Sequence, residues 1–481
     1  MSNRIYFIFL VAIMLLAGIL RLYRFDSPIA DWHSWRQSDT SAVSKIFITE
    51  GIDLLHPRYF DISNIQSGFD NPEGLRMVEF PLFNLIHAVL YMTFGVFTIE
   101  QWGRLTTIIF SLLATLFIGL ITSKYVNKRS GLFASFFYAA LPFSVFYGRS
   151  ILPDTAMIAS VLGAIYFFSV WIDSVGQKSK TAMFRTSMFL LAFVFAVASL
   201  LFKPYALFFL LPIGVLAIEK FKFGVVKQWP LWIFAAGSII PLVLWRMWIT
   251  NFPEGIPVSA WLFNAGNIRF KGAYFYWLFG ERISQLILGY YTIFAVLGVF
   301  KKIGEKHFYF FLSFIVASLA YMTVIARGNV QHDYYQIAII PSLAILIGRG
   351  LDFLLSFKER ENKILAVIVS ICVTFLMFSL SWYHVRDFFN VNNIAIVEVG
   401  KRADAILPKN ARVIAPYDGD TTFLYYVNRP GWPAFQASAE ELKQKGATHM
   451  ILLSPNPETI EDLTSKHTVI EHKPEYIIVA L

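Results

Sequence analysis

The ten residues Asp31–Thr40, DWHSWRQSDT, bring together two carboxylates, a histidine, an arginine and two tryptophans. They follow a strongly apolar segment by a turn or two, at an expected membrane boundary. Because charged groups are costly to desolvate there, so dense a cluster predicts a site rather than a plain linker. A carboxylate such as Asp31 or Asp39 can act as a general base, and Arg36 can bind an anion.

Other reactive side chains fall in later segments that we expect on the same side of a membrane. A carboxylate there can activate a hydroxyl group, while lysine and arginine hold a phosphate leaving group and stabilise its growing charge. The hypothesis is that these groups converge on one surface. The residues are Glu79, Arg149, Asp154, Lys203, Arg327, His332 and Tyr335.

Each of these residues also has a purely structural interpretation, which stays open. Asp154 precedes an apolar run and could be a helix N-cap. Lys203 could snorkel toward lipid head groups, although a lone lysine in an apolar hairpin is costly. Glu79 could be a helix-start acid, and His332 and Tyr335 could belong to an interfacial aromatic belt. Four further residues look like loop acids: Asp26, Asp53, Asp61 and Asp70.

The composition is that of a membrane protein. Of 481 residues, 56% are hydrophobic and 15% are charged, against roughly 25% charged in soluble domains. The net charge of +9 requires no nucleic-acid partner, because basic cytoplasmic loops produce the same excess. The single cysteine, Cys372, excludes an intrachain disulfide or a cysteine metal cluster. No cleavable signal is expected, since the first apolar segment is long enough to be retained as a span.

Apolar runs predict about eleven transmembrane helices joined by loops that alternate in charge. Short loops rich in lysine and arginine stay in the cytoplasm, so the remaining loops face outward. The basic loops are residues 124–129, 178–185, 219–227, 301–306 and 358–363. The predicted spans are Ile5–Leu20, Leu105–Ser123, Gly131–Tyr147, Thr155–Trp171, Ser187–Phe202, Tyr205–Ile218, Leu231–Ile249, Ile283–Phe300, Phe308–Ile325, Ile337–Leu355 and Ile364–Trp382.

The segment Phe80–Phe97 is apolar enough to resemble a span, but it is short and contains Asn84 and His87. If it crossed the membrane, every later basic loop would face outward. We therefore predict a helix that lies in the outer interface or re-enters the membrane. The first outer loop then covers residues 23–104, with juxtamembrane helices, and a loop of that length is usually functional.

The tail after residue 384 carries more charge and turn pairs such as Asp418-Gly419. Short strands are predicted at Ala411–Pro416, His449–Leu453 and Tyr476–Leu481, with a helix at Ser438–Lys445. The sequence therefore predicts an all-α polytopic membrane domain over residues 1–383. A small soluble α/β domain follows over residues 384–481 on the outer side.

Five motifs, in order and on one side, resemble those of the GT-C membrane glycosyltransferases. The pattern is similar to the family 39-like group, which includes protein O-mannosyltransferases and the aminoarabinose transferase acting on lipid A. The first loop resembles a bacterial branch with a WRQ-x-D-T signature, although it lacks the Asp-Glu pair of better-known relatives. The other motifs are EFPLF at Glu79–Phe83, GRSILPDTA at Gly148–Ala156, Lys203-Pro204 and HDYYQIAIIP at His332–Pro341, so the resemblance covers roughly residues 5–385.

This resemblance implies a multi-pass glycosyltransferase of the cell (inner) membrane with its active site on the periplasmic or extracellular side. It would transfer a sugar from a polyprenyl-phosphate donor to a lipid, glycan or protein acceptor, with inversion. Asp39 would be the base, with Asp31 as the alternative base. Glu79 and Asp154 would position the acceptor or the base. Arg36, Arg149, Lys203 and Arg327 would contact the donor phosphate, and His332 and Tyr335 would line the lipid groove.

Two other functions fit the same compartment. A lipid-linked sugar flippase or transporter would place ionisable residues at mid-membrane depth, whereas here they lie mostly at span ends. An O-antigen ligase or polymerase typically carries a large late periplasmic loop, whereas here the long loop comes first. Oligosaccharyltransferases of the GT-C class use a divalent ion held by several acids. For this chain we predict no cofactor, with a divalent metal as the alternative.

Overall fold

A computed structural model describes residues 1–300, 307–357 and 359–481 of the chain. The predicted basic loop at 301–306 and Lys358 lie outside these residues. The chain divides into two compact units, each assembled from three segments. Unit 1 contains Met1–Phe25, Arg104–Trp245 and Ser259–Asp387, and unit 2 contains Asp26–Gly103, Arg246–Val258 and Phe388–Leu481. The first outer loop and the C-terminal tail thus belong to the same unit.

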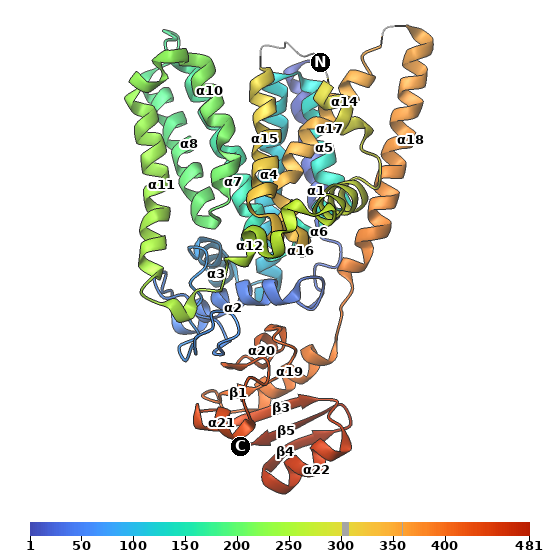
Figure 1. Ribbon diagram of the computed structural model, residues 1–481. Helices are drawn as coiled ribbons and strands as arrows, with labels where there is room; N and C mark the ends of the chain where they lie inside the picture. Colours follow the sequence, from blue (N-terminus) through green and yellow to red (C-terminus); the bar gives the residue numbers. More distant parts are fainter. Residues whose placement is uncertain (301–306, 358) are drawn as a thin grey trace. The chain divides into compact units, whose positions relative to one another are not determined.

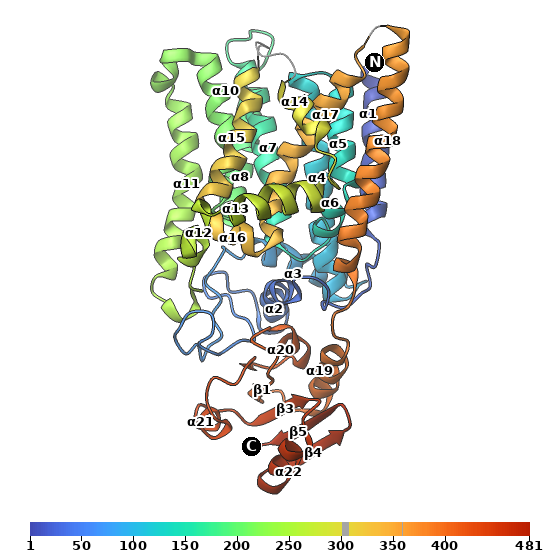
Figure 2. The ribbon, with the colours of Figure 1, turned by 45° about the vertical axis from the view of Figure 1, so that its right-hand side comes forward.

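Unit 1 is a bundle of helices (Figure 1, Figure 2). Its longer helices are α1 (Asn3–Arg21), α4 (Ile99–Tyr125), α5 (Lys128–Ala140), α7 (Pro153–Ser174), α8 (Ala182–Phe202), α10 (Leu211–Phe221), α11 (Trp229–Ile249), α14 (Ile293–Phe300), α15 (Phe308–Val324), α17 (Ile340–Leu354) and α18 (Arg360–Val385). Its shorter helices are α6 (Pro142–Tyr147), α9 (Ala206–Phe209), η1 (Lys222–Lys227), α12 (Trp261–Asn264), η3 (Ala265–Phe270), α13 (Gly272–Phe275), α16 (Ala326–Gln331) and η5 (Asp333–Ile339), with a π-helix, η4 (Tyr276–Ile287).

Seven helical stretches within the described residues are long and apolar enough to cross a membrane. The other four predicted spans fall on helices that are short or interrupted. Pro142 begins α6 where α5 has ended, because proline cannot continue the preceding helix. Gly289 and Tyr290, both at positive φ, separate η4 from α14. The count of eleven therefore stays a prediction.

Several basic loops of unit 1 lie at one end of the bundle, which we call the basic end. Lys124, near the end of α4, pairs with Asp173 near the end of α7 at 2.8 Å. Lys128 donates a hydrogen bond of 3.0 Å to the carbonyl oxygen of Met1. The loops between α7 and α8 and between α10 and α11 belong to this end too. The same helices place their other ends, which carry predicted site residues, away from it.

Unit 2 contains the first outer loop and the C-terminal sheet. Its helices are α2 (Ser34–Glu50), α3 (Leu82–Phe94), η2 (Pro253–Gly255), α19 (Ala395–Ile406), α20 (Thr422–Val427), α21 (Ala439–Gln444) and α22 (Pro457–Lys466). The short helix η6 (Arg386–Phe389) begins in unit 1 and ends in unit 2. Helix α3, predicted to lie in the interface or re-enter, has 13 residues and is therefore about 20 Å long, shorter than the hydrocarbon core.

The C-terminal sheet has five strands in the order β2-β1-β3-β5-β4. Strand β1 pairs in parallel with β2 and β3, while β5 pairs antiparallel with β3 and β4. The three predicted strands and the predicted helix α21 are present, and Ser438 and Glu441 form a capping box at the start of α21. The strands are β1 (Val413–Ile414), β2 (Gly431–Trp432), β3 (His449–Leu453), β4 (Thr468–Lys473) and β5 (Tyr476–Ala480).

The first outer loop extends this sheet. Asp61 forms a parallel bridge with Gly431 of β2. The amide of Gly431 donates to the carbonyl oxygen of Phe60 at 2.8 Å, and the amide of Ile62 donates back to that of Gly431 at 3.0 Å. The side chain of Ile62 is buried in the same apolar cluster as Trp432. The loop and the tail therefore share one core, which fixes the segments on either side of Asp61.

Candidate active site

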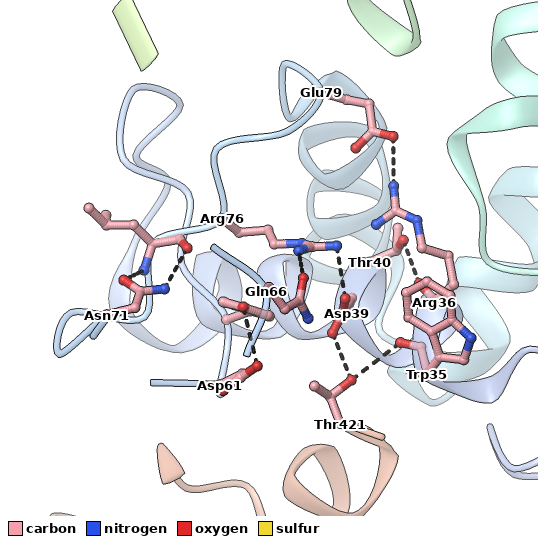
Figure 3. A network of polar contacts seen from close by, with 12 residues as sticks. Trp35, Arg36, Asp39, Thr40, Asp61, Gln66, Asn71, Arg76, Glu79 and Thr421 are labelled. Carbon is pink, nitrogen blue, oxygen red and sulfur yellow. Dashed lines mark hydrogen bonds and ion pairs between the residues drawn. The ribbon is translucent and has the colours of Figure 1, made fainter. Parts of the chain in front are cut away.

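Asp39 lies on α2 and is enclosed by two partners (Figure 3). The helix begins after His33, which adopts a φ of 55°, and it ends at Gly51, where φ is 103°. Arg76 Nη2 lies 2.9 Å from Asp39 Oδ2 in an ion pair, and Thr421 Oγ1 donates a hydrogen bond of 2.7 Å to Asp39 Oδ1. The Asp39 side chain is 0% exposed. In this arrangement its carboxylate joins α2 to two distant segments.

Arg76 belongs to a buried network that sequence reasoning missed. Its guanidinium donates to Gln66 Oε1 and lies 5.0 Å from the centre of the Tyr59 ring. Asp61, predicted to be a loop acid, does lie in the first outer loop, but it is fully buried rather than solvated. Burial raises the pKa of Asp61 to about 6, although hydrogen bonds from Ser63 oppose the shift. Figure 3 shows Asp61, Gln66 and Arg76 beside Asp39.

Glu79 pairs with Arg36 across the space between α2 and α3. Arg36 Nη2 lies 2.6 Å from Glu79 Oε1. Thr40 Oγ1 donates to the carbonyl oxygen of Arg36 at 2.9 Å, and Asn84 Nδ2 donates to that of Thr40 at 2.6 Å. These bonds fix α2 against the start of α3. The Glu79 side chain keeps 14% of its surface exposed, more than the other three predicted carboxylates.

Asp31 precedes α2 and is buried. Gln37 Nε2 donates to Asp31 Oδ1 at 2.7 Å and to the carbonyl oxygen of Trp32 at 3.1 Å. The Trp32 ring stacks on Phe388, with 4.9 Å between the ring centres. Asp31 therefore anchors the turn that starts α2, and α2 carries both Arg36 and Asp39 of the predicted first-loop set.

In unit 1, Asp154 and Lys203 form a buried ion pair. Asp154 lies in the first turn of α7, and Lys203 ends α8 because Pro204 follows it. Lys203 Nζ lies 2.7 Å from Asp154 Oδ1 and 2.8 Å from Oδ2. Only 5% of the lysine side chain and 3% of the aspartate side chain are exposed, so Lys203 does not snorkel to the surface. Three rings lie 5.4–5.6 Å from Nζ: Tyr205, Tyr334 and Tyr335.

The predicted segment that contains His332 packs beside this pair. His332 stacks on Tyr334, with 5.5 Å between ring centres, and Tyr334 stacks on Tyr335 at 4.7 Å. The hydroxyl of Tyr147 donates to Asp333 Oδ1. A column of aromatic rings thus lines this end of the bundle, as the aromatic-belt interpretation allows, but the tyrosine rings are buried rather than exposed.

Three arginines of unit 1 donate to neutral oxygens. Arg149 is buried and donates to the carbonyl oxygen of Arg24 at 3.3 Å. Arg327 is partly exposed, and its Nε lies 3.4 Å from Gln331 Oε1. Arg269, which sequence reasoning missed, donates to the carbonyl oxygen of Val324 at 3.3 Å and so lies close to the start of α16. A lone arginine inside a long loop carries no sequence signal that would have singled it out.

The carboxylates do not fit a divalent ion. Within the described residues, no group of three or more His, Cys, Asp or Glu side chains could hold a metal. Each predicted acid instead faces a cation or an uncharged donor: Arg76 and Thr421 at Asp39, Arg36 at Glu79, Lys203 at Asp154 and Gln37 at Asp31.

No family profile and no curated protein matches the sequence. Solved structures do match. ArnT from Cupriavidus metallidurans, solved with undecaprenyl phosphate, aligns over 100% of this chain and 98% of its own, with a TM-score of 0.64 and 14% identity. An oligosaccharyltransferase from Archaeoglobus fulgidus, solved with Zn and sulfate, aligns over 92% of this chain and 67% of its own, with a TM-score of 0.61 and 12% identity.

This chain has the GT-C fold. A mycobacterial arabinofuranosyltransferase, AftD, shares it over 100% of this chain, with a TM-score of 0.55 and 13% identity. The chain spans 42% of the length of AftD. At these identities the likeness concerns the fold, and the residues that would do chemistry must be argued from this chain.

Within the GT-C fold the predicted residues fall into two sets. Unit 2 holds Asp31, Arg36, Asp39 and Glu79, and the contacts above connect Arg36 with Glu79 and Asp39 with Arg76. Unit 1 holds Arg149, Asp154, Lys203, Arg327, His332 and Tyr335, of which Asp154, Lys203, Tyr335 and His332 lie in one cluster.

Proposed function

We propose that this chain is an integral-membrane glycosyltransferase that moves a sugar from a polyprenyl-phosphate donor to an acceptor. The observation that carries the proposal is the GT-C fold over the whole chain. ArnT was solved with undecaprenyl phosphate, and the archaeal oligosaccharyltransferase AglB was solved with dolichol-phosphate. A donor with a lipid tail also explains why ionisable residues are retained at the ends of apolar helices.

The transfer takes place on the extracytoplasmic face of the cell membrane. Lysines and arginines of short loops stay in the cytoplasm, so the basic end of unit 1 faces inward. The loop between α7 and α8, for example, contains Lys178 and Lys180 and no acid. Asp154 and Lys203 stand at the other ends of α7 and α8, and they then face the periplasm or the exterior.

Arg327 is the proposed ligand of the donor phosphate. Its guanidinium is partly exposed, and its hydrogen bond goes to Gln331 rather than to an acid. Guanidinium groups bind phosphate through two parallel N–H···O bonds, which stabilise the charge left on the leaving group. Arg269 is a second candidate, because it contacts the residues just before α16. Lys203 and Arg149 hold the shape of the site, and His332 and Tyr335 line the path of the lipid.

Glu79 is the proposed general base. Its carboxylate accepts the proton of the acceptor hydroxyl while that oxygen attacks the anomeric carbon. The bond from this carbon to the phosphate oxygen breaks with inversion, and polyprenyl phosphate leaves with the bonding electrons. Arg36, 2.6 Å away, positions the carboxylate. Asp39 is fully buried and is held by both Arg76 and Thr421, so we assign it to holding α2. Asp31 is the second candidate base.

A transfer assay in proteoliposomes tests the proposal. The wild type is given a panel of radiolabelled polyprenyl-phosphate sugars and a lipid, glycan or protein acceptor extract. Glu79→Gln is expected to lose about 100-fold or more in turnover and to keep donor binding, because a general base contributes that much. Asp53→Asn is the matched control, since this acid is 58% exposed in the same loop. A wild type that moves lipid across the bilayer but transfers no sugar would promote the flippase alternative.

A further inference from the structure

A pocket of about 890 Å³ opens at the basic end of unit 1. It lies between the loop that joins α7 to α8 and the first turns of α8 and α11. Its walls are apolar and include Trp171, Phe189 and Ile233, and the rings of Trp171 and Phe189 are 5.2 Å apart. Trp229, also in the lining, is 70% exposed. Tryptophan at the end of a membrane helix marks the level of the lipid head groups.

Three cations line the same pocket: Lys178, Lys180 and Arg185. The guanidinium of Arg185 donates to the carbonyl oxygens of Gln177 at 3.4 Å and of Lys180 at 2.9 Å. Lys180 Nζ lies 4.7 Å from the centre of the Phe184 ring. All residues of the lining are described, and none of them is an acid. The pocket therefore presents three positive charges on apolar walls.

The nearest acid in the sequence does not neutralise these charges. The carboxylate of Asp173, at the end of α7, is 2.8 Å from Lys124 Nζ. Between Ser174 and Arg185 the chain contains no aspartate or glutamate. An anion that enters the pocket therefore meets no repulsion from its lining.

The pocket is separate from the candidate active site. It lies at the C-terminal end of α7 and the N-terminal end of α8, whereas Asp154 and Lys203 lie at the opposite ends of these helices. Both helices are long and apolar enough to cross a membrane. Leu190 and Ile233 of the lining are each 52% exposed and would face acyl chains.

We propose that this pocket binds an anionic glycerophospholipid of the leaflet opposite to the candidate active site. The phosphate of the head group pairs with Lys178, Lys180 and Arg185, and the upper acyl chains lie against Trp171 and Ile233. A basic pocket between helix ends attracts an anionic head group, and apolar walls retain its chains, which a free phosphate does not have. This binding is independent of the proposed transferase reaction.

Native mass spectrometry of the full-length protein in detergent tests the proposal. Phosphatidylglycerol, phosphatidylcholine with the same chains, and inorganic phosphate are titrated separately. The triple variant Lys178→Gln, Lys180→Gln, Arg185→Gln is expected to weaken phosphatidylglycerol binding about 100-fold, since each charge contributes roughly fivefold. The matched control loses the same charge at exposed lysines elsewhere: Lys271→Gln, Lys401→Gln, Lys443→Gln.

A second variant separates the pocket from general attraction by charge. Ile233→Trp fills part of the space between the apolar walls and leaves the net charge unchanged, so it is expected to weaken phosphatidylglycerol binding. The control triple variant is expected to bind phosphatidylglycerol like the wild type. Equal weakening by both triple variants would overturn the proposal. The proposal would also be overturned if phosphatidylcholine bound as tightly as phosphatidylglycerol. The same holds if inorganic phosphate bound without a lipid and displaced phosphatidylglycerol.

Discussion

The hydroxyl of Thr421 donates a hydrogen bond of 2.7 Å to the carboxylate of Asp39, although 382 residues separate them in the chain. The same carboxylate is paired with Arg76 at 2.9 Å. Residues at both ends of unit 2 thus meet on one aspartate. The C-terminal tail is therefore part of the support of α2, and α2 carries Arg36, the partner of the proposed base Glu79.

Thr421→Val is expected to loosen the tail. The change leaves Asp39 Oδ1 without this donor inside a buried network, which costs about 1–3 kcal/mol. Limited proteolysis of the tail in detergent should therefore be several-fold faster than in the wild type. Thr464→Val is the control, because its exposed hydroxyl bonds only within α22, to the carbonyl oxygen of Glu461. Equal cleavage rates in Thr421→Val and the wild type would contradict the structural role.

Asp39→Asn and Glu79→Gln are expected to fail for different reasons. Asp39→Asn leaves Arg76 buried without its counter-charge, and breaking a buried pair costs about 3–5 kcal/mol. Glu79→Gln also removes the counter-charge of a largely buried arginine, Arg36, but the pair is partly exposed to water, so the loss of stability should be smaller. Thermal unfolding measured beside sugar transfer distinguishes the two. A stable, inactive Asp39→Asn would restore Asp39 as the base.

The stability of unit 2 is expected to depend on Asp61 between about pH 4 and pH 6. Burial raises the pKa of Asp61 from 3.8 to about 6, so the folded chain holds this proton more tightly than the unfolded chain. Its contribution to stability is therefore complete at low pH and is lost as the pH rises through about 6.

Asp61→Asn isolates this effect. At pH 7 the free energy of unfolding of the variant should exceed that of the wild type by up to about 3 kcal/mol, so the variant should unfold at a higher temperature. This difference should vanish near pH 4. Asp70→Asn, which removes an exposed acid paired with Lys445, is the control and should show no such pH-dependent difference. A constant difference between Asp61→Asn and the wild type at all pH values would refute the assignment.

The pair of Asp154 and Lys203 allows structure and function to be separated. Asp154→Asn leaves a buried lysine charge and is expected to destabilise the bundle by about 3–5 kcal/mol. The double variant Asp154→Asn, Lys203→Met removes the charge as well and should recover most of that loss. If the pair only supports the fold, transfer recovers with stability; if it also shapes the donor site, transfer stays low. Unfolding in detergent and the proteoliposome assay are measured on the same preparations.

Removal of divalent ions is expected to leave transfer unchanged. Each predicted carboxylate is held by a cation or an uncharged donor, and no cluster of three metal-ligating side chains occurs in the described residues. The assay is run after exhaustive treatment with EDTA and again with added Mg²⁺ or Mn²⁺. Activity that disappears with the chelator and returns with a metal would establish a metal site that these residues do not predict.

Local sequence patterns were sufficient to predict many elements of the fold. Apolar runs predicted where the helices of unit 1 lie, and short apolar stretches predicted strands β3 and β5, because the pattern of each element is contained in its own few residues. Strand β2, with two residues, is too short for such a pattern. It exists because β1 and the first outer loop pair with it from both sides.

Partners in the candidate site were harder to predict than its acids. The motif around Asp39 was visible, but nothing in the sequence near Arg76 or Thr421 indicates that they meet it. The burial of Asp61 is also a tertiary effect, because a lone aspartate in a loop is usually solvated. The sequence indicated that Lys203 is a costly charge in an apolar hairpin. That Asp154 is its partner depends on the packing of α7 against α8, which the sequence does not show.

The bridge between Asp61 and Gly431 also bears on how the chain is made. The first outer loop leaves the ribosome early. Its pairing with Gly431 of the sheet and its hydrogen bond from Thr421 can form only after the last segment of the chain has been made. At roughly 5–20 residues per second, synthesis of the intervening 382 residues takes about 20–75 s. During that interval Asp61 and Asp39 lack partners that they have in the finished protein. A nascent chain stalled before residue 421 should therefore expose its first loop to protease, however complete its helices are.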